Sequence, residues 1–160
     1  MAVDIILKIE GVDGESVIQD HEDEIDVLAW SWGMSQSGSM HVGGGGGSGK
    51  VNIQDVSLTK YVDKSSPSLM RACCNGEHLT EATLTIRKAG KDALDYLKIK
   101  MSPVLVTSLD TGGSGGEDRL TENVTLNFAK VEVGYTPQKP DGTGDAEISL
   151  IWNVEKNVEE

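Results

Sequence analysis

The chain is 160 residues long and 38% hydrophobic, which is enough to bury a core, and we expect residues 1–160 to fold as a single domain. Its formal net charge of −12 argues against nucleic acids and anionic membranes as partners, because both require a basic footprint. Soluble proteins are the partners that this charge favours.

The charge is distributed unevenly along the chain. Residues 1–30 hold nine acidic residues and one lysine, residues 50–100 hold nine basic and six acidic residues, and residues 101–160 hold eleven acidic and four basic ones. A solvated acidic surface accounts for such a pattern, but segregated charge also suits one copy of the chain docking onto the next. The sequence leaves both interpretations open.

Cysteine content and the first residues bear on the compartment. Cys73 and Cys74 are adjacent, a spacing that rarely allows disulfide geometry, so the chain is expected to begin in a reducing cytoplasm. The first ten residues do not form a signal peptide, because Asp4 and Lys8 interrupt their apolar run, and no segment is long and apolar enough to cross a membrane. Cys73, Cys74 and His78 lack a fourth ligand nearby, so no metal and no cofactor is expected.

Alternating apolar residues predict strands over residues 3–9 and 25–32. One face of the second strand carries Trp30 and Trp32 and is expected in the core. The opposite face carries Ile25, Val27, Ala29 and Ser31.

A loop over residues 35–49 follows, composed almost wholly of Ser, Gly, Met and His, with five consecutive glycines at 43–47. Such a segment has no hydrophobic burial to offset its large conformational entropy, so we expect it either to be mobile or to be ordered by a partner. Residues 44–50, GGGGSGK, match seven positions of the phosphate-binding pattern GxxxxGK[ST]. Val51 replaces the required hydroxyl residue and strand-like sequence follows, so nucleotide binding through Gly44–Lys50 is a remote alternative.

After this loop the apolar phase slips near Gln54–Asp55, which predicts a bulge or sharp bend between Ile53 and Val56. A short helix is predicted over residues 66–75. Ser65 is a favourable N-cap, Pro67 suits the first helical position, and Gly76 suits the position past the end.

Strands resume over residues 82–87, 97–106, 124–135 and 148–154. Pro103 is expected to introduce a bulge, since the apolar phase reverses after it. Residues 109–118, LDTGGSGGED, predict a second glycine loop. Together the segments indicate a mainly β protein, an antiparallel β-barrel of about eight strands with one short flanking α-helix and long glycine-rich loops.

Catalytic signatures do not occur in the sequence. His21, His41 and His78 lie in polar or glycine-rich context, and the patterns of serine hydrolases, zinc proteases and cysteine nucleophiles are missing. We therefore do not expect an enzyme.

Three long segments resemble the haemolysin-coregulated protein (Hcp) family, the inner-tube subunit of bacterial type VI secretion: EIDVLAWSWGMSQSGSMH, GGGGGSGKVNIQDVSLTKYVDKSSPSL and TGGSGGEDRLTENVTLNFAKVEV. The resemblance extends from the first predicted strand to the last. It implies a tight β-barrel that assembles into homohexameric rings, and rings that stack into a tube similar to a phage tail tube. It also implies a contractile sheath and baseplate around the tube, a spike protein at its tip, and small effector proteins bound inside the rings.

This resemblance implies a location and candidate sites. The chain is expected in the bacterial cytoplasm before firing, and afterwards outside the cell or in a target cell, exported without a signal peptide. The small-residue face at Ala29, Ser31 and Gly33 is expected to line the lumen and contact effectors, and the alternative is that this face only packs on the helix. Because of its length and composition, the glycine loop is the first candidate for the stacking or subunit contact, through Ser37, His41, Gly43, Gly44, Gly45, Gly46, Gly47 and Lys50. The second loop is the runner-up, through Gly112, Gly113, Gly115, Gly116, Glu117 and Asp118.

Some members of the family carry a toxin domain behind the barrel, whereas this chain ends a few residues after its last predicted strand, so a plain tube subunit is expected. One alternative to a secretion tube stays open. A phage-like tail-tube or scaffold protein that is not used for secretion would have a closely similar structure, and neighbouring genes would distinguish it.

Overall fold

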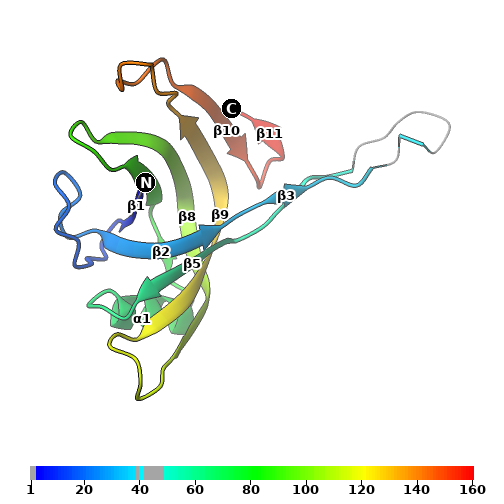
Figure 1. The fold of residues 1–160 in the computed structure, drawn as a ribbon. Helices are drawn as coiled ribbons and strands as arrows, with labels where there is room; N and C mark the ends of the chain where they lie inside the picture. Colours follow the sequence, from blue (N-terminus) through cyan, green and yellow to red (C-terminus); the bar gives the residue numbers. More distant parts are fainter. Residues whose placement is uncertain (1–2, 39, 42–48) are drawn as a thin grey trace.

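The computed structural model describes residues 3–38, 40–41 and 49–160, and most of them form one strongly curved antiparallel sheet (Figure 1). The strands are β1 (Val3–Ile9), β2 (Ile25–Ser31), β3 (Met34–Ser35), β4 (Asn52–Ile53), β5 (Val56–Tyr61), β6 (His78–Leu79), β7 (Ala82–Lys88), β8 (Leu94–Gly112), β9 (Thr121–Tyr135), β10 (Ile148–Asn153) and β11 (Val158–Glu159). The helix α1 spans Ser66–Asn75.

The predicted antiparallel barrel is confirmed. Strands follow the order β11-β10-β9-β5-β2-β1-β7-β8-β6, and β9 also pairs with β8, so β1, β2, β5, β7, β8 and β9 close into a ring. Six strands therefore close the barrel rather than about eight. The difference arises because β8 and β9 are long strands that pair with each other over most of their lengths, and because β9 extends past β5 so that its last residues pair with β10 outside the ring.

The core lies inside this ring, where the inward residues of successive strands meet. Leu7, Ile25, Leu58, Leu84, Met101 and Leu126 are all fully or almost fully buried there. Trp30 and Trp32 pack against this core while remaining partly exposed, as their shared face predicted.

The bulge expected at Pro103 is wrong. Met101 lies opposite Val131 and Val104 lies opposite Phe128, so the register is continuous across Pro103. All four of these residues are buried, although they stand three positions apart on each strand. Both strands therefore change which of their alternate residues point inward at the same place, and no extra residue is needed. The register shift in this pair lies instead between Val106 and Ser108.

The helix has its predicted bounds, but its N-terminus differs from the prediction in two details. Ser65 makes no capping side-chain hydrogen bond, and Pro67 is the second helical residue because the helix begins at Ser66. Gly76 closes the helix in the left-handed conformation, with a φ of 68° that favours glycine. Leu69 and Ala72 point from α1 into the core.

Candidate functional site

A polar groove of about 390 Å³ lies on the outer face of four adjacent strands, β2, β5, β9 and β8. Eight of its lining residues form two rows that cross the strands in register. One row is Ala29, Thr59, Asn123 and Asp110, and the other is Ser31, Ser57, Thr125 and Ser108. Consecutive residues of a strand point to opposite faces of the sheet. The residues of these rows therefore point outward, and their neighbours in sequence point into the core. The rows contain a single charged residue, Asp110.

A bulge in β2 brings Ala29 and Ser31 to this groove. The register with β5 shifts between Val27 and Ala29, so that Leu28 is the extra residue. The prediction that Ile25 and Val27 share a face with Ala29 and Ser31 is therefore wrong: Ile25 and Val27 are buried, whereas Ala29 and Ser31 are exposed.

Gly33, the third predicted lumen residue, is not among the residues that line the groove. Its carbonyl accepts a hydrogen bond of 3.0 Å from the backbone N–H of Gln54, which joins the two arms of the glycine loop at their base. The indole N–H of Trp32 donates to the Gln54 carbonyl at 2.9 Å. The phase slip expected near Gln54 thus coincides with the break between β4 and β5.

Hydrogen bonds between side chains fix part of the groove. Thr59 Oγ1 donates to Asn123 Oδ1 at 2.8 Å, and the hydroxyls of Ser108 and Thr125 lie 2.6 Å apart. Next to the groove Asp55 accepts hydrogen bonds from Thr107 Oγ1 at 2.7 Å and from Asn127 Nδ2 at 2.8 Å. Within the described residues, Asp110 has no ion-pair partner.

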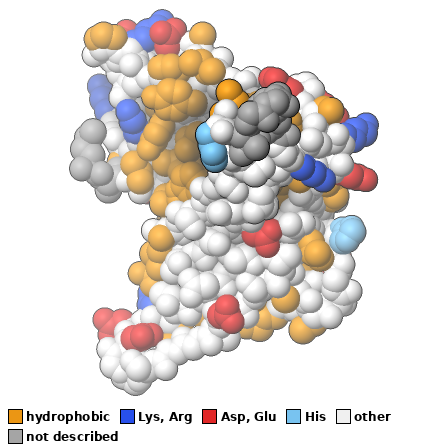
Figure 2. Space-filling view, turned by 90° about the vertical axis from the view of Figure 1, so that its right-hand side faces the viewer, with side chains coloured by type: hydrophobic (Ala, Val, Ile, Leu, Met, Phe, Trp, Pro, Cys, Tyr) orange, Lys and Arg blue, Asp and Glu red, His pale blue; other side chains and the backbone are white. Residues whose placement is uncertain are grey.

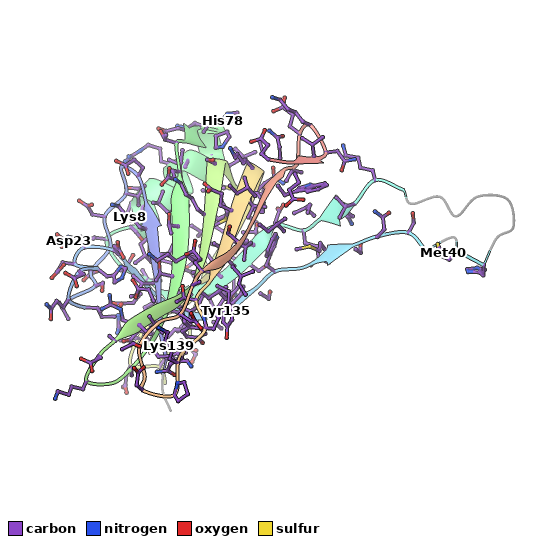
Figure 3. The ribbon with its side chains drawn as sticks, turned by 90° about the horizontal axis from the view of Figure 1, so that it is seen from above. Lys8, Asp23, Met40, His78, Tyr135 and Lys139 are labelled. Atoms are coloured by element: carbon purple, nitrogen blue, oxygen red, sulfur yellow. The ribbon has the colours of Figure 1, made fainter. Side chains whose placement is uncertain are left out.

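The first glycine loop extends from the barrel as a two-stranded ribbon (Figures 1 and 3). Strands β3 and β4 form a sheet of their own, with Met34 opposite Ile53. The predicted contact residues Ser37, His41 and Lys50 are exposed beyond this pair, and Gly43–Gly47 lie outside the described residues. Strand β4 follows Lys50 closely, where a phosphate-binding loop would require a helix.

The second glycine loop is shorter than predicted. Strand β8 continues through Leu109–Gly112, where Gly112 pairs with Thr121, so the predicted contact residue Gly112 belongs to a strand. The other predicted residues, Gly113, Gly115, Gly116, Glu117 and Asp118, are exposed in the turn between β8 and β9. Arg119 lies over the Tyr61 ring, 3.6 Å from its centroid, and anchors the base of this loop.

An apolar groove of about 240 Å³ lies between the ribbon and β10, and sequence reasoning missed it. Its lining is Trp32, Met34, Val51, Ile53, Val131, Leu150 and Trp152. A band of apolar side chains runs beside the projecting loop in Figure 2. Ile148, two residues before Leu150 on β10, is 66% exposed. The signal was the alternation of Ile148, Leu150 and Trp152, but alternation cannot tell whether the chain itself covers that face.

The opposite end of the molecule is acidic. Figure 3 shows Asp23 and Met40 at opposite ends. A second polar groove there, of about 280 Å³, includes Glu10, Asp13, Asp20, Glu22 and Asp23 among its lining residues.

An ion-pair cluster connects the acidic loop between β1 and β2, residues 10–24, to the barrel. His21 Nε2 lies 3.2 Å from Asp95 Oδ2, and Arg87 Nε donates to Asp95 Oδ1 at 2.6 Å. Burial raises the pKa of Asp95, but the hydrogen bonds from Arg87 and His21 outweigh it and hold that pKa below its ordinary value.

The described residues form neither a metal site nor a membrane-spanning helix. No group of three or more His, Cys, Asp or Glu side chains within residues 3–38, 40–41 and 49–160 is arranged to hold a metal ion. In the described part of the chain, no helix has the length and apolar character needed to cross a membrane. Cys73 and Cys74 are both free thiols.

Comparisons with known proteins agree with one another. The family model described as "Type VI secretion system effector, Hcp" matches residues 6–135. Protein hcp1 of Pseudomonas aeruginosa is 63% identical over 161 residues, which cover 99% of this chain and 99% of that protein. Among solved structures, one of a type six secretion system protein superimposes with a TM-score of 0.94 at 29% identity, covering 99% of this chain and 100% of that one. Hcp1 from Salmonella typhimurium superimposes with a TM-score of 0.83 at 36% identity, covering all of both chains.

Proposed function

Because the chain belongs to the Hcp family of type VI secretion proteins, we propose that copies of it close into hexameric rings, which stack into the inner tube of the secretion machine. The family consists of structural tube proteins rather than enzymes. A ring requires a heterologous contact that closes, and a tube requires a second contact, between rings, that does not. We assign three surfaces of the protomer to the contact within a ring, the contact between rings and the wall of the channel.

The observation that carries this proposal is the apolar surface that the protomer leaves uncovered. The apolar groove and the exposed side chains of Ile148 and Leu150 form one region beside the ribbon. A two-stranded ribbon is at best marginally stable alone in water, and uncovered apolar surface marks interaction sites. A neighbouring copy in the ring would cover this region.

The ribbon is our candidate for the contact between rings. It projects from one end of the protomer, and its sequence between Asp26 and Asp55 contains no acidic residue but contains His41 and Lys50. The acidic groove lies at the other end, so head-to-tail stacking would bring this ribbon of one ring to the acidic end of the next. The loop at residues 113–118 is the second candidate for this contact.

The polar groove is our candidate for the wall of the channel. Its alanine and hydroxyl side chains leave room for cargo, and its residues lie on the outside of the barrel, where six copies arranged in a ring could enclose a lumen. Small effector proteins would bind there, and the spike, sheath and baseplate would contact the assembled tube. The protein would assemble in the bacterial cytoplasm and leave the cell when the sheath contracts.

Replacing Ser31 by arginine tests the channel proposal, because Ser31 is exposed in the groove. We expect Ser31→Arg to form rings but to lose the effector proteins that accompany wild-type rings, since six large cations would then face the lumen. The control is Thr80→Arg, which adds the same side chain at an exposed position outside the groove. Effector levels in cells that are undiminished by Ser31→Arg would contradict the channel assignment.

Secretion itself has a separate test. The protein should accumulate in the culture medium of cells with a contractile sheath and stay inside cells whose sheath gene is deleted. Retention in both strains would favour the alternative of a tail-tube or scaffold protein that is not used for secretion.

A further inference from the structure

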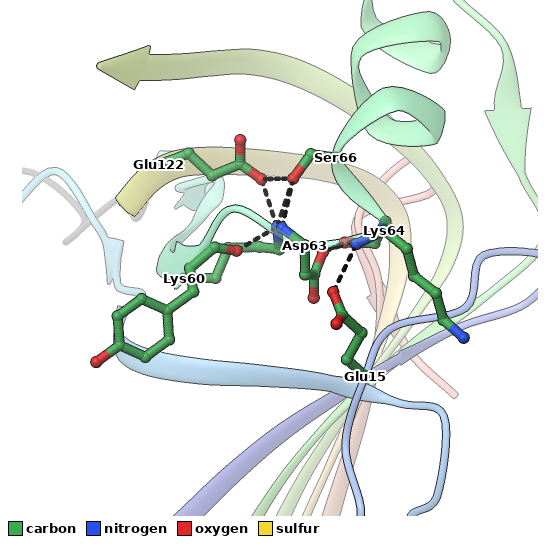
Figure 4. Close-up of polar contacts among 8 residues, drawn as sticks. Glu15, Lys60, Asp63, Lys64, Ser66 and Glu122 are labelled. Atoms are coloured by element: carbon green, nitrogen blue, oxygen red, sulfur yellow. Dashed lines mark hydrogen bonds and ion pairs between the residues drawn. The ribbon is translucent and has the colours of Figure 1, made fainter. Parts of the chain in front are cut away.

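A buried cluster of charged and polar side chains lies behind the polar groove, where β5, β9 and the start of α1 meet (Figure 4). Lys60 and Glu122 are directly opposite each other on β5 and β9, and both side chains are fully buried. Lys60 Nζ donates to Glu122 Oε1 and, at 2.9 Å, to the carbonyl of Tyr61. Asp63 Oδ1 lies 3.2 Å from the same nitrogen.

Ser66, the first residue of α1, connects the helix to this ion pair. Its hydroxyl donates to Glu122 Oε1 at 2.6 Å. The Ser66 oxygen also accepts from Lys60 Nζ at 3.3 Å and from the backbone N–H of Asp63 at 3.0 Å. One hydroxyl thus joins the helix, the preceding loop and two barrel strands.

The remaining anchors of α1 are few. The helix has ten residues, no acidic residue in its first turn, no basic residue in its last, and no side-chain cap from Ser65. Leu69 and Ala72 are the apolar side chains of the helix that are buried in the core, and the partly buried Cys73 packs against it. Helices this short are marginal in water on their own, so tertiary anchors determine whether α1 stays in place.

The cluster is also incompletely satisfied. Two carboxylates, Glu122 and Asp63, face one ammonium group, and Glu122 Oε2 is buried with no hydrogen-bond partner in the described part of the chain. A buried carboxylate oxygen without a donor is costly, and water would solvate it once the helix moved away. Solvation of this oxygen offsets part of the cost of opening.

We propose that this cluster is a latch that holds residues 62–79 against the barrel, and that this segment, containing α1 and β6, opens as a unit before the barrel strands separate. The segment joins β5 to β7 and is bounded by strands of the closed barrel. Thr59 and Asn123 in the polar groove are chain neighbours of Lys60 and Glu122. The inference stands whether or not the groove lines a channel.

Hydrogen exchange measured by mass spectrometry on the full chain tests the latch. Ser66→Ala removes the hydroxyl that joins α1 to the pair and leaves both charges in place. A hydrogen bond to a charged group is worth enough to speed exchange through local opening about ten- to a hundredfold. We expect this acceleration in the amides of α1 and no change in those of β5, β7 and β9.

Lys60→Met provides a second variant, since it leaves both carboxylates without their cation. It should accelerate exchange in α1 and also where β5 pairs with β9. The matched control is Lys100→Met, because the exposed Lys100 Nζ lies 3.5 Å from Glu81 Oε2 at the surface, and this variant should leave α1 unchanged. The latch is refuted if Ser66→Ala leaves α1 exchange unchanged or accelerates α1 and β7 equally. If Lys60→Met does not fold, Ser66→Ala alone decides the question.

Discussion

Replacing Ile148 and Leu150 by serine removes two partly exposed apolar side chains of β10 next to the apolar groove. Ile148 is 66% exposed and Leu150 is 37% exposed in the isolated chain. If a neighbouring copy covers this region in a ring, both side chains lose their remaining contact with water on assembly. The double variant should therefore weaken the contact between subunits more than it weakens the fold.

The size of this effect follows from the exposed fractions. Complete burial of a leucine or isoleucine side chain is worth about 1.5–3 kcal/mol. Scaled by the exposed fractions, Ile148 contributes about 1–2 kcal/mol and Leu150 about 0.6–1.1 kcal/mol to each contact. The double variant should thus lose about 2 kcal/mol per contact, which is roughly a thirtyfold weaker association.

Sedimentation velocity over a range of protein concentrations measures this association. The control is Val17→Ser, because Val17 is an apolar side chain that is 91% exposed in the acidic loop, outside the apolar groove. Circular dichroism of each variant would check that it is folded. Equal association midpoints for the double variant and the wild type, or an equal shift in the control, would refute the assignment of this face to the ring contact.

Three further predictions concern stacking and pH. Replacing Gly43–Gly47 by a short rigid turn should leave rings intact and prevent tubes, as seen by electron microscopy, and normal tubes would rule out the ribbon as the stacking contact. Six copies carry a net charge of −72, from −12 each, so stacking followed by light scattering should increase with salt, which screens charges within about 10 Å at 0.1 M. A decrease would show that attraction between charged surfaces dominates. Because the pKa of Asp95 is lowered in the folded state, its stabilisation is present above its unfolded pKa and is lost as pH falls through its folded pKa. Asp95→Asn should therefore cost about 1 kcal/mol near neutral pH, and the gap to the wild type in denaturant titrations should close as the pH falls through the folded pKa of Asp95, which lies below that of an ordinary aspartate; a gap independent of pH would contradict this.

Alternation of apolar residues predicted nearly all of the barrel strands, because each strand has one face in a single core. The bounds of α1 followed from Pro67 and Gly76, whose backbone preferences act locally. Alternation failed where long-range pairing decides the outcome. The bulge at Leu28 depends on how β2 meets β5, and the shared phase reversal near Pro103 depends on β9 reversing at the same level. Gly112 belongs to a strand because Thr121 pairs with it, although its neighbours in sequence are typical of a loop.

The candidate site was partly accessible from sequence. Ala29 and Ser31 were identified because small residues alternate with tryptophans, but their partner rows on β5, β9 and β8 require the register of four strands. Lys60 fell in the inward phase of β5 together with Val56 and Leu58, yet only the pairing with β9 shows that Glu122 neutralises it. The open apolar face of β10 could not be distinguished from a core face, because both have the same pattern.

The most direct test of assembly is the mass of the purified protein by light scattering at low and high salt, with negative-stain electron microscopy of the same samples. We predict a particle of about 103 kDa, six times the chain mass of 17.1 kDa, that appears as a ring with an open centre. A compact monomer of 17.1 kDa under both conditions would contradict the tube function and the assembly surfaces assigned to the ribbon, the apolar groove and the polar groove, and would leave the barrel fold intact.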